Sequence, residues 1–170
     1  MSDTTVLIMS DTHGNSMAIE QLLNDYKGRI ATVVHLGDHV DDMLNFIHED
    51  TITYHIVSGN TDSFLDIFDE RVIELIGKRI FITHGHMYDV KEKLDNLIFK
   101  TLEMKVDACL FGHTHVPVLF SKNDTIFLNP GSLAYSSTNT ERGYALLRIS
   151  QEGVVTGNLL AYKPSDWPVL

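Results

Sequence analysis

The feature of this sequence that most constrains its fold is a series of short apolar runs, each followed by a polar segment that contains glycine. Short apolar runs bounded by turn residues predict buried β-strands. Ligands bind beyond the carboxyl ends of strands in open α/β sheets, so we expect the polar segments to meet at one edge. These segments are Asp11-Thr-His13-Gly14, Gly37-Asp38, Gly59-Asn60-Thr61-Asp62, His84-Gly85-His86 and Gly112-His113-Thr-His115.

The first third of the chain alternates predicted strands with predicted helices. Apolar residues at helical spacing predict a helix from Met17 to Tyr26, with Asn15 or Ser16 as its N-terminal cap. A second helix is predicted over 43–47, with Asp41 and Asp42 at its N-terminus, where carboxylates are favourable. Buried strands are predicted at 6–9, 31–36 and 52–57.

The rest of the chain predicts a second sheet. Apolar residues between 94 and 104 predict a helix that begins near Tyr88 or Asp89. Hairpins are predicted at 72–83, around a Gly77-Lys78 turn, and at 144–162. Further strands are predicted at 108–111, 117–121 and 125–128. The sum is an α/β chain with two packed sheets flanked by helices.

Composition fits one domain. A chain of 170 residues with 44% hydrophobic residues is long enough to bury one sizeable core, so we expect a single domain over 1–170. The one cysteine, Cys109, lies in an apolar run, which predicts a buried and inert thiol. The chain alone therefore provides neither a disulfide framework nor a thiolate metal site.

Charge and hydropathy limit the partners. A formal net charge of -10 with 13 lysines and arginines argues against a long nucleic acid, because binding to a phosphate backbone relies on clustered cationic side chains. A small phosphorylated substrate is still compatible with this charge, because divalent cations would make the site locally positive. The sequence shows no basic leader and no apolar stretch of the ~20 residues that a membrane helix needs, so we expect a cytoplasmic protein with no membrane partner.

The polar segments contain aspartate, histidine and asparagine, which suit first-row divalent metal ions. Asp11 and His13 are two residues apart, so in an extended segment they face the same side and can chelate one ion; His113 and His115 share this spacing. If Asp38 bridges two ions, each ion has four protein ligands. The first set is Asp11, His13, Asp38 and His115, and the second is Asp38, Asn60, His84 and His113.

Two metal ions ~3.5–4 Å apart turn a bridging water into a hydroxide and hold the oxygens of a phosphoryl group. The sequence therefore predicts a metal-dependent phosphoester hydrolase in which that hydroxide attacks the phosphorus. We expect Asp38, Asn60 and His113 to take part in catalysis as ligands of these ions.

The order of the motifs, Asp-x-His, Gly-Asp, Gly-Asn, His-Gly-His and Gly-His-Thr-His, is similar to that of the calcineurin-like metallophosphoesterase superfamily. The short length and the later Asn129-Pro130-Gly131-Ser132 segment resemble its small YfcE-type phosphodiesterase branch. The resemblance implies a four-layer α-β-β-α sandwich and metal ligands at the seven positions given above. It also implies two divalent ions, with manganese expected first and nickel, iron, cobalt or zinc as alternatives, and a homodimer or higher homo-oligomer.

One position departs from the family pattern. Many members carry a histidine directly after Gly-Asn, where this chain has Thr61. A threonine hydroxyl is too weak an acid to protonate a leaving group near neutral pH. Asp62 and His86 are the nearest candidates to supply that proton or to orient a ligand. We therefore expect esters with good leaving groups to be the better substrates.

Several alternatives stay open from the sequence. Within the hydrolases, a phosphomonoesterase or a nuclease for short oligonucleotides is the second choice after a phosphodiesterase. A non-catalytic scaffold subunit of the same fold, as in one eukaryotic relative in the retromer complex, is the other class; loss of ligands would be expected there. His39 either lines the site or is an ordinary loop residue, and Asn129 and Ser132 either contact substrate or an outer-shell histidine, or form an ordinary turn.

Overall fold

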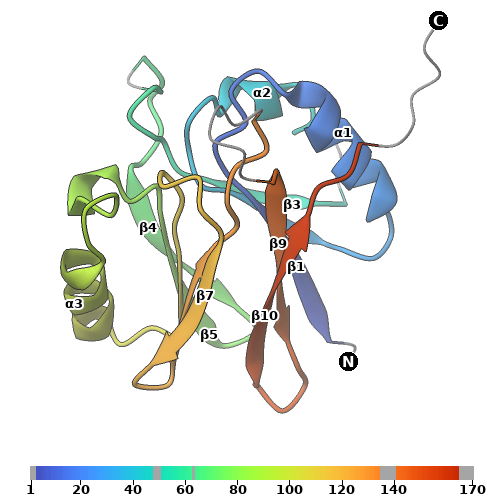
Figure 1. The fold of residues 1–170 in the computed structure, drawn as a ribbon. Helices are drawn as coiled ribbons and strands as arrows, with labels where there is room; N and C mark the ends of the chain where they lie inside the picture. The colour runs from blue at the N-terminus through green and yellow to red at the C-terminus, as the bar shows by residue number, and fades with distance from the viewer. Residues whose placement is uncertain (1–2, 48–50, 63, 135–140, 165–170) are drawn as a thin grey trace, which may run out of the picture.

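The computed structural model describes residues 3–47, 51–62, 64–134 and 141–164. Figure 1 shows two sheets packed face to face, with α1 and α2 on the outer side of one and α3 on the outer side of the other. Each sheet has five strands. This arrangement confirms the predicted α-β-β-α sandwich.

The first sheet has the strand order β10-β9-β1-β2-β3. Strands β1, β2 and β3 are parallel, and β9 and β10 add to them as an antiparallel hairpin. The parallel pairs are joined by crossovers through α1 and α2, as parallel strands require. The bounds are β1 Thr4–Met9, β2 Thr32–His35, β3 Thr53–Ile56, β9 Gly143–Ile149 and β10 Val155–Ala161.

The second sheet has the order β4-β5-β6-β8-β7, in which β5, β6 and β8 are parallel and the edge strands are antiparallel. The predicted Gly77-Lys78 turn is displaced by one residue, because Ile76 and Gly77 take the two left-handed positions that a tight hairpin needs, with φ of 50° and 70°. The bounds are β4 Glu70–Leu75, β5 Lys78–Thr83, β6 Ala108–Leu110, β7 Val118–Lys122 and β8 Thr125–Asn129.

The first helix has the predicted length, and the second is shorter than the apolar pattern predicts. Helix α1, Ser16–Asp25, has the predicted cap, since the Asn15 side chain accepts a hydrogen bond from the Ala18 amide. Helix α2 is a single turn at Asp41–Leu44 and does not extend to residue 47. Asp41 and Asp42 lie in the first turn of α2, as predicted, but no side chain of the described residues makes a capping hydrogen bond there.

The predicted start of the third helix near Tyr88 or Asp89 was also wrong. A 3-10 turn, η1, occupies His86–Tyr88, and Asp89 then adopts a left-handed conformation with φ of 54°, which an α-helix cannot accommodate. Helix α3 begins only at Asp95 and ends at Met104.

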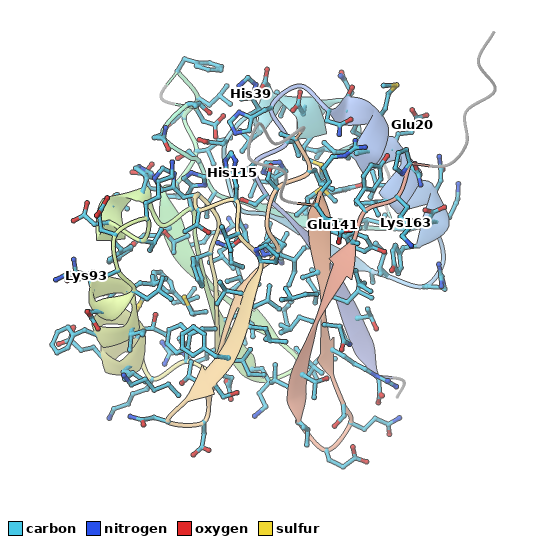
Figure 2. The ribbon with its side chains drawn as sticks, in the orientation of Figure 1. Glu20, His39, Lys93, His115, Glu141 and Lys163 are labelled. Atoms are coloured by element: carbon cyan, nitrogen blue, oxygen red, sulfur yellow. The ribbon has the colours of Figure 1, made fainter. Side chains whose placement is uncertain are left out.

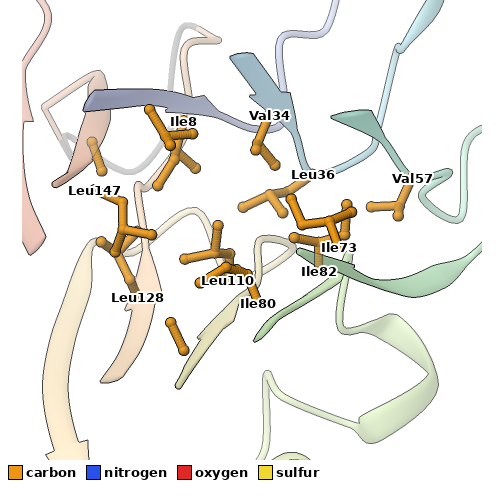
Figure 3. Packing of buried hydrophobic residues seen from close by; sticks show 13 residues of the cluster. Ile8, Val34, Leu36, Val57, Ile73, Ile80, Ile82, Leu110, Leu128 and Leu147 are labelled. Atoms are coloured by element: carbon orange, nitrogen blue, oxygen red, sulfur yellow. The ribbon is translucent and has the colours of Figure 1, made fainter. Parts of the chain in front are cut away.

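The largest core cluster lies between the two sheets, as Figure 3 shows. Ile8 and Val34 extend from the first sheet toward Ile82 and Leu110 of the second. Alternate residues of β1 point the other way, so Leu7 packs under α1. Both faces of β1 are therefore buried, which explains why its sequence is continuously apolar.

The outer faces of the sheets are covered by helices. Ile19 of α1 and Met43 of α2 pack against the first sheet, and Leu97 of α3 packs against the second. Cys109 of β6 is fully buried under α3, and burial raises the pKa of its thiol to about 12, as expected for an inert cysteine. Within the described part of the chain, none of the helices is long and apolar enough to span a bilayer.

The polar segments follow β1, β2, β3, β5 and β6, all of which belong to the parallel parts of the two sheets. Because the strands of each parallel group end on the same side, both sheets bring their loops to one end of the sandwich.

Candidate metal centre

The loops after the strands bring six of the seven predicted ligands together in two groups. Ligand atoms within each group lie within 4.8 Å of one another. Figure 2 shows His115 and His39 at the end of the molecule where these loops gather. The first group is Asp11, His13 and His115, and the second group is Asp38, His84 and His113.

The first group contains buried polar atoms that the described residues leave unsatisfied. The Asp11 carboxylate is fully buried, and its Oδ2 accepts hydrogen bonds from Ser10 Oγ at 2.5 Å and from the His113 amide at 3.1 Å. Its other oxygen, Oδ1, lies 3.0 Å from His115 Nε2 but has no hydrogen bond within the described chain. His13 Nε2 is also buried and has no hydrogen bond among the described residues. Leaving buried polar atoms unpaired is costly, so a cation is the natural partner for both.

The second group is built on the buried ring of His84. Its Nδ1 donates to the Leu36 carbonyl at 2.7 Å, so Nε2 is the ring nitrogen that faces the group. That Nε2 lies 3.0 Å from His113 Nδ1 and 3.5 Å from Asp38 Oδ1. Two imidazole nitrogens bound to one ion at about 2.1 Å and at right angles would be about 3.0 Å apart. These nitrogens therefore fit a shared metal ion.

The Asp38 carboxylate belongs to the second group and also faces the first. Its Oδ2 is 3.7 Å from His13 Nε2 of the first group, while its Oδ1 is 3.5 Å from His84 Nε2 of the second. This is the position that the bridging hypothesis requires. Thr61 donates to the same Oδ1 from its amide, at 3.0 Å, and from its hydroxyl, at 2.9 Å.

Most of the proposed ligands have an unusual backbone conformation. A left-handed φ in a residue other than glycine costs roughly 1–3 kcal/mol and persists only where the surroundings enforce it. The sequence patterns did not predict this strained backbone at the ligands. The left-handed ligands are Asp11, His13, Asp38, His113 and His115, with φ between 42° and 67°.

Two glycines are needed for the close approach of the ligand loops. A Cβ on Gly59 would overlap Asp38 Oδ1, and a Cβ on Gly112 would overlap Ser10 Oγ and lie 2.9 Å from Asp11 Oδ2. Neither position has room for a larger residue, so these two glycines are steric requirements of the site.

Asn60 is the predicted ligand that the geometry leaves least defined. Its side chain is exposed, on the turn after β3. The groups described above comprise histidine and carboxylate side chains only, so ligation by Asn60 stays a prediction.

The carboxylate of Asp62 is buried and is used by the backbone of neighbouring loops. Its Oδ2 accepts from the amides of Asp38 and Gly59, both at 2.8 Å, and its Oδ1 accepts from the Val40 amide at 3.1 Å. Of the two roles considered for Asp62, this geometry favours orienting a ligand, because the carboxylate holds the Asp38 loop in place.

His86 is the other candidate proton donor, and it lies beside the second group. Its ring centroid is 5.4 Å from that of His84 and 6.2 Å from that of His113. The Nδ1 atom is buried and has no hydrogen-bond partner among the described residues. Burial and the charge of His84 lower the pKa of His86, so it is neutral more often than an exposed histidine.

Electrostatics favour ligand-competent protonation states. Burial and the charge of His84 lower the pKa of His113 to about 4, and burial lowers the pKa of His13. Burial would raise the pKa of Asp11, but contact with His115 and the charge of His84 outweigh it and hold that pKa below its usual value. Neutral imidazoles and ionised carboxylates are the forms that bind metal ions. His115 is the exception, because the Asp11 carboxylate raises its pKa, which marks a place for positive charge.

Asn129 and Ser132 hold the backbone of ligand loops. The Asn129 amide donates to the Gly112 carbonyl at 2.8 Å, and the Ser132 hydroxyl donates to the Asp11 carbonyl at 2.8 Å. Each side chain also accepts a hydrogen bond from an amide two residues on, so both residues form the local turn and brace ligand loops; a contact with substrate or with an outer-shell histidine stays a prediction. The ring of His39 lies 4.9 Å from that of His13, so His39 lines the first group.

Ser10 and Thr12 flank Asp11 and have roles that the sequence patterns missed. Both are fully buried and polar, and Ser10 donates to the Asp11 carboxylate at 2.5 Å. The only sequence signal was their place beside a proposed ligand.

Comparisons with known proteins agree with this geometry. Residues 5–152 match the calcineurin-like phosphoesterase superfamily domain. A phosphodiesterase of Methanocaldococcus jannaschii, MJ0936, is 31% identical over 147 residues, which cover 73% of this chain and 81% of that protein.

Solved structures share the fold. The structure of a predicted phosphoesterase from Streptococcus pneumoniae, 28% identical, matches with a TM-score of 0.72 over 95% of this chain and 99% of that one. The structure of Vps29 from Entamoeba histolytica complexed with zinc, 24% identical, matches with a TM-score of 0.67 over 93% of this chain and 99% of that one. The Vps29 match shows a common fold alone.

Proposed function

This chain belongs to the calcineurin-like phosphoesterase superfamily, and from that membership we propose that it is a dinuclear metal-dependent phosphodiesterase acting on small phosphodiesters. One observation carries the proposal: the Asp38 carboxylate faces both groups of side chains, with one oxygen 3.7 Å from His13 Nε2 and the other 3.5 Å from His84 Nε2. Phosphatases and nucleases commonly use two ions held in this way.

The first ion would be held by the first group, the second by His84 and His113, with Asp38 shared and Asn60 added to the second. Two bound divalent ions would supply a nucleophilic water at neutral pH and would stabilise the charge on the phosphoryl oxygens. Manganese is the ion expected first, and the donor set of imidazole and carboxylate also accepts nickel, iron, cobalt or zinc. The Vps29 structure complexed with zinc supports the capacity of this fold to hold a divalent cation.

Thr61 and His86 are the side chains to consider as sources of a proton for the leaving group. The Thr61 hydroxyl donates its proton to Asp38 Oδ1, so it has none to give to a substrate oxygen. His86 lies beside the second group with a buried Nδ1 that has no partner among the described residues, whereas the Asp62 carboxylate is occupied by backbone amides, so His86 is the better placed of the two to contact the leaving group. Its lowered pKa makes it a weak source of protons at neutral pH. We expect faster hydrolysis of diesters whose leaving group needs little protonation.

The expectations about partners and location follow from the sequence. The net charge of -10 disfavours a long nucleic acid and is compatible with a small phosphorylated substrate bound at a locally positive centre. A homodimer and a cytoplasmic location stay predictions.

The alternative functions differ in what they require of the site. A scaffold subunit does not need an intact ligand set, whereas this chain keeps the histidines and aspartates of both groups, with the ligand atoms of each group within 4.8 Å of one another. A phosphomonoesterase or a short-oligonucleotide nuclease would use the same ligands. The name of the Methanocaldococcus jannaschii relative favours the diesterase among these.

The test begins with protein stripped of metal by a chelator. Manganese and the other divalent ions are restored one at a time, and hydrolysis of bis(p-nitrophenyl) phosphate is compared with that of p-nitrophenyl phosphate. We expect metal-dependent cleavage, faster for the diester, and its loss in Asp38→Ala. A preference for the monoester would favour the monoesterase, and two bound ions with no turnover of either ester would favour the scaffold.

A further inference from the structure

We propose that Asp42 is a positioning residue for the first group of metal ligands, because it fixes the loop that carries Asp11 and His13. The inference rests on the metal centre of the proposed function. It concerns a side chain that the sequence pattern assigned to the N-terminus of α2.

The contacts of Asp42 surround His13 in the chain. Asp42 Oδ2 accepts a hydrogen bond from Thr12 Oγ1 at 2.7 Å and another from the Gly14 amide at 2.7 Å. Thr12 precedes His13 and Gly14 follows it, so one carboxylate oxygen holds the Thr12 side chain and the Gly14 backbone on the two sides of this ligand. Hydrogen bonds to an ionised acceptor are about twice as strong as neutral ones.

The Thr12 hydroxyl has two acceptors within 3.1 Å, Asp42 Oδ2 at 2.7 Å and the His39 carbonyl at 3.1 Å, and the carboxylate is the nearer. His35 Nδ1 accepts from the Gly37 amide at 3.2 Å, so the neutral ring carries its proton on Nε2. That Nε2 lies 3.3 Å from Thr12 Oγ1 and can only donate to it. The hydroxyl is then left to donate its own proton, and the shorter distance and the charge of the carboxylate favour Asp42 over the His39 carbonyl as its acceptor. A chain from His35 through Thr12 to Asp42 results.

The loop needs such a clamp because its backbone is strained. Asp11 and His13, on either side of the fully buried Thr12, have left-handed φ values of 53° and 42°. Residues in this conformation persist only where their surroundings enforce it. Asp42 supplies part of that constraint from outside the loop.

Asp42 also connects the two ligand loops of the centre. It lies four residues after Asp38 in the chain, on α2, and its amide donates to the His39 carbonyl at 3.1 Å. The Thr12 amide donates to the Asp38 carbonyl at 3.4 Å. Asp42 thereby links the loop of the first group to the loop of the shared carboxylate.

Asp42 neither caps α2 nor completes a separate cation site. Its side chain makes no capping hydrogen bond to the helix. It lies near His39 and Asp41 in an arrangement that resembles a cation site, but its Oδ2 is already bonded to Thr12 and Gly14, and Asp41 is 50% exposed. We attach no third ion to this group.

The test measures manganese binding by calorimetry and by electron paramagnetic resonance in the parent protein, Asp42→Ala and Asp41→Ala. The Asp41 variant is a matched control, since it removes the same charge from the neighbouring residue. We expect Asp42→Ala to bind one ion with the parental affinity and the other roughly 10–100-fold more weakly, the usual effect of losing a residue that orients a ligand. The spectrum of a coupled manganese pair should be lost at limiting metal in Asp42→Ala and kept in Asp41→Ala.

Two variants of Thr12 test the same contact from the other side. Thr12→Val removes the hydroxyl with little change in volume and should reproduce the selective loss, whereas Thr12→Ser keeps the hydroxyl and should restore binding. If Asp42→Ala does not fold, this pair decides the question, and equal binding in both variants refutes the role.

The outcomes separate this inference from the proposed function. Parental binding of both ions in Asp42→Ala, or equal losses in Asp42→Ala and Asp41→Ala, refutes the positioning role while leaving the centre intact. A parent protein that binds two ions but hydrolyses no ester contradicts the function and leaves the Asp42 result interpretable. A parent protein that binds no manganese refutes the centre and this inference together.

Discussion

Replacing Asp62 with asparagine removes one charge and one acceptor from the loop that holds Asp38. The carboxylate accepts three backbone hydrogen bonds, from Asp38, Gly59 and Val40. In Asp62→Asn the amide oxygen can keep the first two bonds, but its NH2 group then faces the Val40 amide, donor against donor.

The cost follows from these contacts. An unsatisfied buried amide costs about 1–3 kcal/mol, and each of the two remaining bonds falls from the value of a charged acceptor, about 1.5–3 kcal/mol, to about 1 kcal/mol. The free energy of unfolding should therefore fall by roughly 3–5 kcal/mol. For a chain of this size, roughly 2–4 °C per kcal/mol converts this into a decrease in Tm of about 10 °C.

The assay is thermal unfolding of the metal-free protein, followed by manganese titration. Working without metal separates the stability of the loop from the stabilisation that a ligand adds. Asp66→Asn, an exposed position in the same loop, is the control and should leave Tm within about 1 °C of the parent. Manganese should bind more weakly to the group that contains Asp38.

The opposite pattern would refute this reasoning. If Asp62→Asn keeps the parental Tm and manganese affinity but loses kcat by orders of magnitude, then Asp62 acts as a proton donor and its three backbone contacts are incidental. A loss of Tm and affinity together, with kcat restored at saturating manganese, is the result expected of a residue that holds Asp38.

Three further predictions test other parts of the structure. Gly59→Ala should abolish binding at the Asp38 group because its Cβ overlaps the carboxylate, whereas Gly28→Ala, with φ of 72° and open space, should cost only about 1–2 kcal/mol in urea unfolding and leave metal binding unchanged. Burial lowers the pKa of His35 from 6.5 to about 4, so between these pH values the unfolded chain binds more protons than the folded protein. The free energy of unfolding should therefore fall by about 3 kcal/mol between pH 6.5 and pH 4, and by less in the His35→Gln variant. Chelator treatment should lower Tm, because each ion present at 100 times its Kd adds about 2.7 kcal/mol; an unchanged Tm would argue against bound metal.

Much of the fold was accessible from local patterns. The apolar runs that became β1 and β2 are continuous because both faces of each strand are buried, and such runs are visible without any tertiary information. Helix boundaries were less predictable. Asp89 has a left-handed backbone that delays α3 to Asp95, although the apolar spacing suggested an earlier start.

The sequence by itself determined which segments form strands along the chain and which residue types follow them. It also indicated that these residues meet, because each motif lies directly after a strand and the ends of parallel strands converge at one edge of a sheet. Only the tertiary structure decided what holds those ligands. Asp62 reaches an amide 24 residues away, and Asp42 reaches Thr12 across 30 residues. Contacts over such separations depend on how two sheets and their loops pack, and no local periodicity records them. The left-handed backbone at Asp38 has the same origin, since packing enforces a conformation that the residue alone would avoid.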